Sequence, residues 1–352
     1  MSTSSNSRPE KCPVGFHEII GQQRQTGMLA VSLQKKEVPH AMLFTGEEGI
    51  GKKSTAINFA MACNCIRPRP LAGDAAFSGN VNPCGNCRPC RKIASGIHPD
   101  CYHVKPSGAY IRIEQIRILC SSLALRPNEA SMRVVLISDA HLMNAESGNA
   151  LLKILEEPPE KTVFILTSPE AADILPTIVS RCRHIRFNPI AEDLLEAYLA
   201  ESHGMAPENA MVIASMANGS IGRALAIKDD PGILVHRKRV MAQMEMIFRK
   251  PSGRDLSFAE TISQDWKKID LTLEIMKSWL RDLAVSRYFP DRVCNRDVKA
   301  RLRDLSKNID MDGLIKKTNA VWQAERAIKA NANARLAIEA LAIKLSEQSK
   351  TS

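Results

Sequence analysis

The stretch HAMLFTGEEGIGKKS, residues 40–54, decides the fold of this 352-residue chain. It opens with the apolar run 41–45, which is typical of a buried β-strand. Three glycines and a lysine then satisfy the pattern G-x-x-x-x-G-K of a phosphate-binding loop, namely Gly46, Gly49, Gly51 and Lys52. Glycines let backbone N–H groups curl around a phosphate, and the lysine neutralises its charge. The stretch predicts an α/β domain with a P-loop, and a structural glycine turn is the alternative.

Two features of this loop depart from an ATP-hydrolysing P-loop. The residue after the lysine normally supplies a hydroxyl group to magnesium, but Lys53 stands there and the hydroxyl is displaced to Ser54. Glu47 and Glu48 also place negative charge beside the expected triphosphate. We expect a loop that could hold ATP or ADP but is poorly equipped for magnesium-dependent hydrolysis.

Two further apolar runs indicate that this strand belongs to a parallel sheet. Residues 133–138 (RVVLIS) and 162–167 (TVFILT) are typical of strands that are buried on both faces. A helix is expected between them, capped by Asn144 and ended by the Pro158-Pro159 pair.

The first of these runs leads into Ser138-Asp139-Ala140. An NTPase strand of this kind normally ends in Asp-Glu, in which the aspartate holds magnesium and the glutamate polarises the attacking water. Only one carboxylate is present here where two are needed. Asp139 could contact magnesium or cap a helix, and both interpretations stay open.

A cysteine cluster follows the helix after the P-loop. Cys84, Cys87 and Cys90 form two overlapping C-x-x-C steps, and Cys65 precedes them. Four thiolates can close a tetrahedral zinc site, and this spacing lets one turn present two sulfurs to one metal. Cys63 competes with Cys65 as the first ligand, and a set of reduced structural cysteines or a redox dithiol is the alternative to zinc. No catalytic His or Glu accompanies the sulfurs, so the zinc would be structural.

The pattern of hydrophobic residues changes after Pro189, where the strand signals stop. Short helices with a turn at 218–220 are expected over 190–228, and helical periodicity then dominates, including 322–345. We predict three domains: an α/β P-loop domain over 1–188 with a zinc knuckle at about 65–90, a small helical lid domain over 189–229, and an all-α domain over 230–352.

Composition excludes several classes of protein. Hydrophobic residues make up 44% and charged residues 24% of the chain, so it is neither disordered nor collagen-like. No run reaches the ~18 apolar residues of a membrane span, and the polar start MSTSSNSRPEKC lacks the apolar core of a signal peptide. Ten cysteines in such a long chain argue against a disulfide scaffold. We expect a cytoplasmic protein with no membrane partner.

The formal net charge of +10 is unevenly distributed. Residues 231–352 contain 24 Lys plus Arg against 15 Asp plus Glu, whereas the first 230 residues are nearly neutral. A basic surplus permits a nucleic-acid partner but is weak support for one by itself.

Arg181 stands at a helix end, in the sequence Ser180-Arg181-Cys182. A lone arginine in such a place is usually a solvated surface group. Arginine fingers, however, stabilise charge on a transferring phosphoryl group and can be supplied by a neighbouring subunit. That second interpretation matters for a chain whose own nucleotide site is defective.

The chain resembles the AAA+ clamp-loader subunits of bacterial DNA polymerase III over about residues 15–228. The matching segments are Ile20-Gly21-Gln22, HAMLF into the P-loop at 40–44, the cysteine knuckle after the P-loop helix, NALLKILEEPP at 149–159 and TIVSRC at 177–182. The last ~120 residues match only in being helical and in position, where the family has an oligomerising collar.

This resemblance implies a subunit of the type that does not hydrolyse ATP. The family alignment places Ser138 at the magnesium aspartate, Asp139 at the catalytic glutamate and Ser168 at or near the γ-phosphate sensor. Gly222 falls where the sensor arginine is expected. Arg181 is retained and would be presented to ATP bound by a neighbouring gamma/tau subunit. The implied partners are gamma/tau and delta and, through the complex, the sliding clamp and primed DNA in the bacterial cytoplasm.

Two other functions are compatible with parts of the sequence. A gamma/tau-like ATPase would use Ser54 and Asp139 in place of the missing magnesium ligands. A zinc-containing nucleic-acid-binding module would draw on the cysteine knuckle and the basic C-terminal third.

Overall fold

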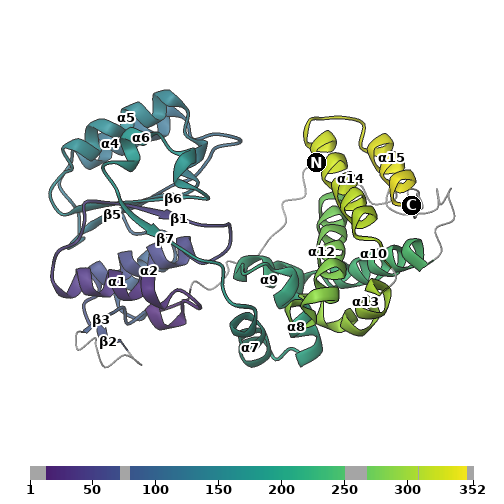
Figure 1. Ribbon diagram of the computed structural model, residues 1–352. Helices are drawn as coiled ribbons and strands as arrows, with labels where there is room; N and C mark the ends of the chain where they lie inside the picture. The colour runs from purple at the N-terminus through teal and green to yellow at the C-terminus, as the bar shows by residue number, and fades with distance from the viewer. Residues whose placement is uncertain (1–12, 72–79, 250–267, 308, 347–352) are drawn as a thin grey trace, which may run out of the picture. The chain divides into compact units, whose positions relative to one another are not determined.

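The computed structural model describes residues 13–71, 80–249, 268–307 and 309–346 (Figure 1). The chain forms two compact units. The first unit takes the residues up to 195 together with 218–223, and the second takes 196–217 together with the residues from 224 onward. Parts of the predicted domains lie outside the described residues, namely 1–12, 72–79, 250–267, 308 and 347–352. The three domain boundaries stay predictions.

The first unit is built on a five-stranded parallel sheet with the strand order β4-β5-β6-β1-β7. The strands are β1 (Ala41–Thr45), β4 (Cys101–Val104), β5 (Arg133–Ile137), β6 (Thr162–Ser168) and β7 (Arg183–Arg186). Every residue of β1, β5 and β6 is buried, as the three apolar runs predict. The predicted α/β fold is confirmed.

Helices cover both faces of this sheet, which is why the central strands have no polar side (Figure 1). One face carries α1 (Gln23–Gln34) and α2 (Lys52–Asn64), and the other carries α4 (Ile113–Leu123), α5 (Ala145–Glu156) and α6 (Pro176–Val179). The shorter elements of this unit are η1 (Phe16–Glu18), β2 (Arg69–Pro70), β3 (Asn80–Asn82), α3 (Arg88–Ala94), η2 (Ala140–Leu142) and η3 (Ala171–Asp173).

Side chains alternate along β6 between two hydrophobic cores. Val163 and Ile165 pack with Phe59 of α2 on one face, whereas Phe164 and Leu166 pack on the other face with the helices α4, α5 and α6. The helix before β6 has the expected cap, because the Asn144 side chain accepts a hydrogen bond from Ser147 N at 2.9 Å. The sheet is therefore held by two separate layers of apolar packing.

The second unit is helical, as predicted for the C-terminal part of the chain. Its helices are α8 (Pro207–Met216), α10 (Pro231–Arg249), α12 (Ile269–Tyr288), η5 (Pro290–Arg292), η6 (Arg296–Val298), α13 (Lys299–Ser306), α14 (Met311–Lys329) and α15 (Ala334–Ser346). The division between the units falls within α7 (Glu192–His203) and α9 (Ile221–Asp229). Trp279 is 2% exposed, and its ring centroid lies 5.1 Å from that of Phe248 in the core.

Helical periodicity over 322–345 conceals a break. The structure has two helices there, α14 and α15, separated by a turn in which Asn331 takes a positive φ of 61°. Asparagine tolerates this left-handed conformation, so it can end a helix without glycine. None of the helices in the described residues is long and apolar enough to cross a membrane.

Candidate functional site

The P-loop follows β1 at the carboxyl edge of the sheet, where parallel α/β folds bind ligands. Gly46, Gly49 and Gly51 have φ values of 135°, 76° and 103°, which L side chains rarely adopt. Lys52 begins α2, so the loop leads directly into a helix N-terminus. The backbone thus has the geometry that the sequence predicts for a phosphate loop.

The P-loop lysine is bound to the loop itself. Lys52 Nζ donates hydrogen bonds to the carbonyl oxygens of Gly46 and Glu47, the latter at 2.7 Å. Lys52 is 9% exposed, and this burial lowers its pKa, while the carboxylate of Asp139 opposes the shift. The ammonium group that would neutralise a phosphate is therefore engaged with backbone oxygens.

A segment distant in sequence lies against the middle of the same loop. Ser220 Oγ donates to Glu48 O at 2.8 Å, and Gly222 N donates to Gly49 O at 2.9 Å. A Cβ on Gly49 would come within 3.0 Å of Ser220 Oγ and would lie 3.2 Å from Gly222 Cα. This part of the chain is where the family resemblance expects a sensor arginine, and here it supplies close backbone packing instead.

The space beside the loop is small. A cavity of about 90 Å³ is lined by residues of the loop, β7 and the segment after β6, among them Gly46, Glu170 and Phe187. Pockets that hold small ligands usually measure ~300–1,000 Å³. The cavity is far below that range.

The residues beyond β5 offer little to a magnesium ion. Ser138 is buried, and its hydroxyl is hydrogen-bonded to His103 Nε2 at 2.7 Å. Desolvation, then the positive charges of Lys105 and Lys53, lower the pKa of His103 to about 4, so this pair is uncharged at neutral pH. His103 lies on β4, and no local sequence pattern indicates its contact with Ser138, 35 positions away.

Asp139 and Ser168 both lie at this edge of the sheet. Asp139 has a left-handed backbone with φ 55° and precedes η2, but its side chain makes no capping hydrogen bond. Ser168 pairs in register with Thr45, and its hydroxyl donates to Glu170 O at 2.7 Å. The exposed Lys53 and the half-buried Ser54 begin α2. The neighbouring strands β1, β5 and β6 thus bring the P-loop, Asp139 and Ser168 to one edge of the sheet, and their role in binding a nucleotide stays a prediction.

Arg181 lies just beyond α6, with 35% of its side chain exposed. Its Nη1 donates to Thr177 O at 2.9 Å, and its Nη2 donates to Glu156 Oε1 at 2.6 Å. Cys182 next to it is half-buried against the hydrophobic core, and burial raises the pKa of its thiol to about 11. The arginine thus remains accessible to solvent beside a residue that packs on the core.

The four predicted cysteines of the knuckle come together in space. The sulfurs of Cys65, Cys84, Cys87 and Cys90 all lie within 4.8 Å of one another. Tetrahedral zinc–sulfur bonds of about 2.3 Å place sulfurs roughly 3.8 Å apart, and Cys87 Sγ is 4.0 Å from Cys65 Sγ. The cluster is consistent with a structural zinc site.

The backbone favours the thiolate of Cys84, whereas burial raises the pKa of Cys65 and Cys90. Cys84 N donates to Cys65 Sγ and Cys87 N donates to Cys84 Sγ, both at 3.3 Å. Burial raises the pKa of Cys84, but the backbone N–H groups of Cys87 and Asn86 outweigh it and lower the pKa to about 6. Thiolates are the form that binds metal. Cys63 lies apart from the cluster, beside Cys101, and burial raises the pKa of its thiol.

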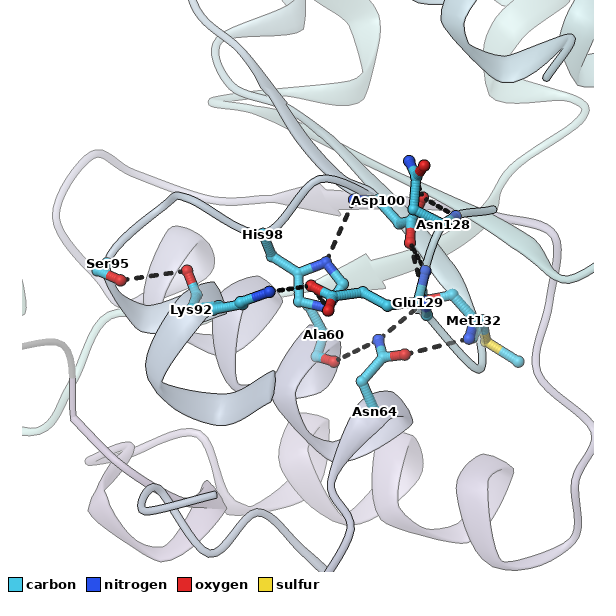
Figure 2. A network of polar contacts seen from close by, with 10 residues as sticks. Ala60, Asn64, Lys92, Ser95, His98, Asp100, Asn128, Glu129 and Met132 are labelled. Atoms are coloured by element: carbon cyan, nitrogen blue, oxygen red, sulfur yellow. Dashed lines mark hydrogen bonds and ion pairs between the residues drawn. The ribbon is translucent and has the colours of Figure 1, made fainter. Parts of the chain in front are cut away.

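A buried polar network holds the elements that carry the cysteines (Figure 2). Asn64, directly before Cys65, accepts from Met132 N at 3.1 Å and donates to Met132 O at 2.9 Å. Burial raises the pKa of Asp100, but backbone N–H groups of residues 128–130, each donating at 2.8 Å, outweigh it and hold the pKa below its usual value. This network fixes the end of α2 to the loop before β5.

His98 extends the network toward α3 (Figure 2). Its Nδ1 accepts from Asp100 N at 3.2 Å, and its Nε2 lies 3.8 Å from Glu129 Oε1. Glu129 is in turn paired with Lys92 of α3. These polar residues position the knuckle. The spacing of the cysteines predicts the metal ligands but does not indicate these neighbours.

The chain is similar in sequence to subunits of DNA polymerase III. The family model described as DNA polymerase III, delta subunit, matches residues 21–191. The DNA polymerase III subunit delta' of Bacillus subtilis (strain 168) is 27% identical over 334 residues, which make up 93% of this chain and 96% of that protein. The DNA polymerase III subunit tau of Escherichia coli (strain K12) is 33% identical over 224 residues, which make up 62% of this chain and 33% of tau.

Among solved structures, the chain is similar to the RuvB Holliday junction branch migration motor of Thermotoga maritima. That match has 14% identity and a TM-score of 0.44, and it covers 92% of this chain and 86% of RuvB.

The two kinds of DNA polymerase III relative differ in extent. The match to delta' spans nearly the whole of both proteins, whereas this chain spans only about a third of tau. The prediction of a clamp-loader subunit of DNA polymerase III is confirmed by these sequence matches. The chain belongs to the delta-prime family of DNA polymerase III clamp-loader subunits.

Proposed function

We propose that this subunit does not hydrolyse ATP and instead supplies Arg181 to ATP bound by a neighbouring subunit. It would assemble with gamma/tau and delta in the bacterial cytoplasm and help to load the sliding clamp on primed DNA. Its contribution to catalysis is electrostatic, because a guanidinium stabilises charge that develops on the transferring phosphoryl group.

One contrast carries this proposal. The chain's own loop has its lysine tied to Gly46 O and Glu47 O and has the neutral Ser138–His103 pair at the magnesium position. Arg181, on the other hand, is solvent-accessible at the end of a short helix. A domain with this fold retains the group that acts on a partner's nucleotide and lacks the groups that act on its own.

We further propose that zinc binds Cys65, Cys84, Cys87 and Cys90 and is structural. Four sulfur ligands would leave no open coordination position for a substrate or water. The cysteines come from the end of α2, the loop after β3 and the start of α3. Zinc would therefore fasten these elements together.

ATP turnover tests the proposal in two settings. The purified chain alone should show no hydrolysis above background, and Lys52→Met should not change that result. In the reconstituted complex with DNA and clamp, Arg181→Ala should slow hydrolysis at the site that Arg181 serves by about 100-fold or more. Turnover by the chain alone that Lys52→Met abolishes would instead support a gamma/tau-like ATPase.

A further inference from the structure

We infer that Glu156 is a positioning residue for Arg181, holding its guanidinium ready for the phosphates of a neighbour's nucleoside triphosphate. The inference rests on the proposed function of Arg181. Its basis is the ion pair between Glu156 Oε1 and Arg181 Nη2 at 2.6 Å, together with the hydrogen bond from Arg181 Nη1 to Thr177 O at 2.9 Å.

The two contacts fix the plane of the guanidinium. An unrestrained arginine has several rotatable bonds and loses considerable rotamer entropy when it engages a ligand. Thr177 O and the Glu156 carboxylate hold Nη1 and Nη2 from two separate elements, α6 and α5. Part of the ordering is thus complete before the partner's nucleotide arrives, which is the way preorganised groups favour a transition state.

The same contacts leave the guanidinium able to act. It has five N–H donors, and the contacts to Glu156, Thr177 and a long one of 3.5 Å to Ser180 Oγ involve Nη1 and Nη2. The side chain is also 35% exposed. Donors and open surface therefore remain for a phosphate oxygen.

Glu156 is well placed to hold a cation. It is the last residue of α5, where the partial negative charge of the helix end disfavours an unpaired carboxylate and favours a paired arginine. Its side chain is 50% exposed, so the ion pair is screened and weak. A weak pair can orient the arginine without preventing it from turning to a triphosphate.

Single and double variants in the reconstituted, DNA- and clamp-stimulated complex test the inference. Glu156→Ala should lower the kcat of ATP hydrolysis by about two- to fivefold, with little change in KM, because the finger acts on the transition state. Glu156→Gln should retain most of the rate, since its amide oxygen can still accept from Nη2. Glu157→Ala, which removes the adjacent carboxylate, is the matched control and should leave the rate unchanged.

The double variant separates positioning from a general structural effect. In the Arg181→Ala background, Glu156→Ala should have no further effect on kcat. The melting temperature of the Glu156→Ala variant should match that of the unmodified chain. Three outcomes would overturn the role of Glu156. Glu156→Ala could lower the rate even in the absence of Arg181, or it could raise the rate. It could also leave the rate unchanged while Arg181→Ala slows hydrolysis. No effect of Arg181→Ala itself would instead remove the proposed function.

Discussion

Ser138 shows how one residue alters the chemistry of this edge of the sheet. By family resemblance it stands where an active relative has a magnesium-binding aspartate, and its hydroxyl is 2.7 Å from His103 Nε2. A hydroxyl and a neutral imidazole give a divalent cation no compensating negative charge. This position therefore holds a neutral hydrogen-bonded pair.

The protonation of His103 is directly measurable. NMR titration of its imidazole should give a pKa of about 4, well below the ordinary value, because desolvation and the charges of Lys105 and Lys53 disfavour the imidazolium. The stability that this shift contributes is complete above pH ~6.5 and is lost as pH falls toward 4. His103→Asn should therefore reduce the fall in unfolding free energy across that range. A midpoint near 6.5 would contradict this environment for His103.

Residues joined in sequence could be predicted, whereas residues joined only by the fold could not. The glycines and lysine of the P-loop fall within residues 46–52, and Cys84, Cys87 and Cys90 fall within residues 84–90. The contacts of His103 with Ser138 and of Glu156 with Arg181 connect residues 35 and 25 positions apart. No local pattern marks such pairs, since either partner alone resembles an ordinary surface group.

Among the secondary-structure elements, burial decided which could be predicted. The strands β1, β5 and β6 are buried throughout and mostly apolar, because helices cover both faces of the sheet. The edge strand β7 has the sequence RHIR, with only Ile185 buried, so it carries no run of apolar residues. The break between α14 and α15 leaves no signal in the pattern, because apolar periodicity continues across a turn that depends on one asparagine.

The cysteine cluster joins two elements, α2 and α3. Mass spectrometry under native conditions should find about one zinc per chain. Cys87→Ser should remove it and destabilise the first unit by on the order of 3 kcal/mol, since metal binding free energy is folding free energy. Cys120→Ser, which changes a cysteine outside the cluster, should retain the zinc. If Cys87→Ser lost this stability but still bound zinc, the result would argue against the site.

The packing of residues 218–223 on the P-loop can be isolated with glycine substitutions. Gly49→Ala should cost about 1–3 kcal/mol of unfolding free energy, because the new Cβ meets Ser220 and the backbone has a φ of +76°. Gly96→Ala is matched in backbone conformation, with a φ of +71°, and has open space around its Cβ. It should cost only the backbone penalty, about 1–2 kcal/mol. If chemical denaturation gave equal losses of unfolding free energy for Gly49→Ala and Gly96→Ala, the packing of Ser220 on the loop would contribute nothing to stability.

At the scale of the whole molecule, the basic surplus and an exposed apolar stripe both belong to the C-terminal helices. Leu336 and Ile343 on α15 are 62% and 53% exposed, and Ala340 lies between them on the same face. Exposed apolar residues at helical spacing are typical of a protein interface. We interpret this face as a contact for other clamp-loader subunits.

Incorporation of variants into the clamp-loader complex tests this interpretation. Ile343→Asp should weaken incorporation into the complex with gamma/tau and delta by about tenfold, because it places a charge in an apolar contact. Leu194→Asp changes an exposed leucine in the first unit and serves as the control. Both variants should keep the melting temperature of the parent chain. Unchanged assembly of Ile343→Asp in analytical ultracentrifugation would place the interface elsewhere.

One comparison of ATP turnover tests most directly the proposal that Lys52 supports no hydrolysis whereas Arg181 acts on a neighbour's ATP. Complexes reconstituted with DNA and clamp would carry this chain as Lys52→Met, as Arg181→Ala or unchanged. If the P-loop of this chain does not hydrolyse ATP, the Lys52→Met complex should show normal turnover. If Arg181 acts in trans, the Arg181→Ala complex should show a marked loss of turnover. Loss of turnover with Lys52→Met and none with Arg181→Ala would contradict both halves of the proposal.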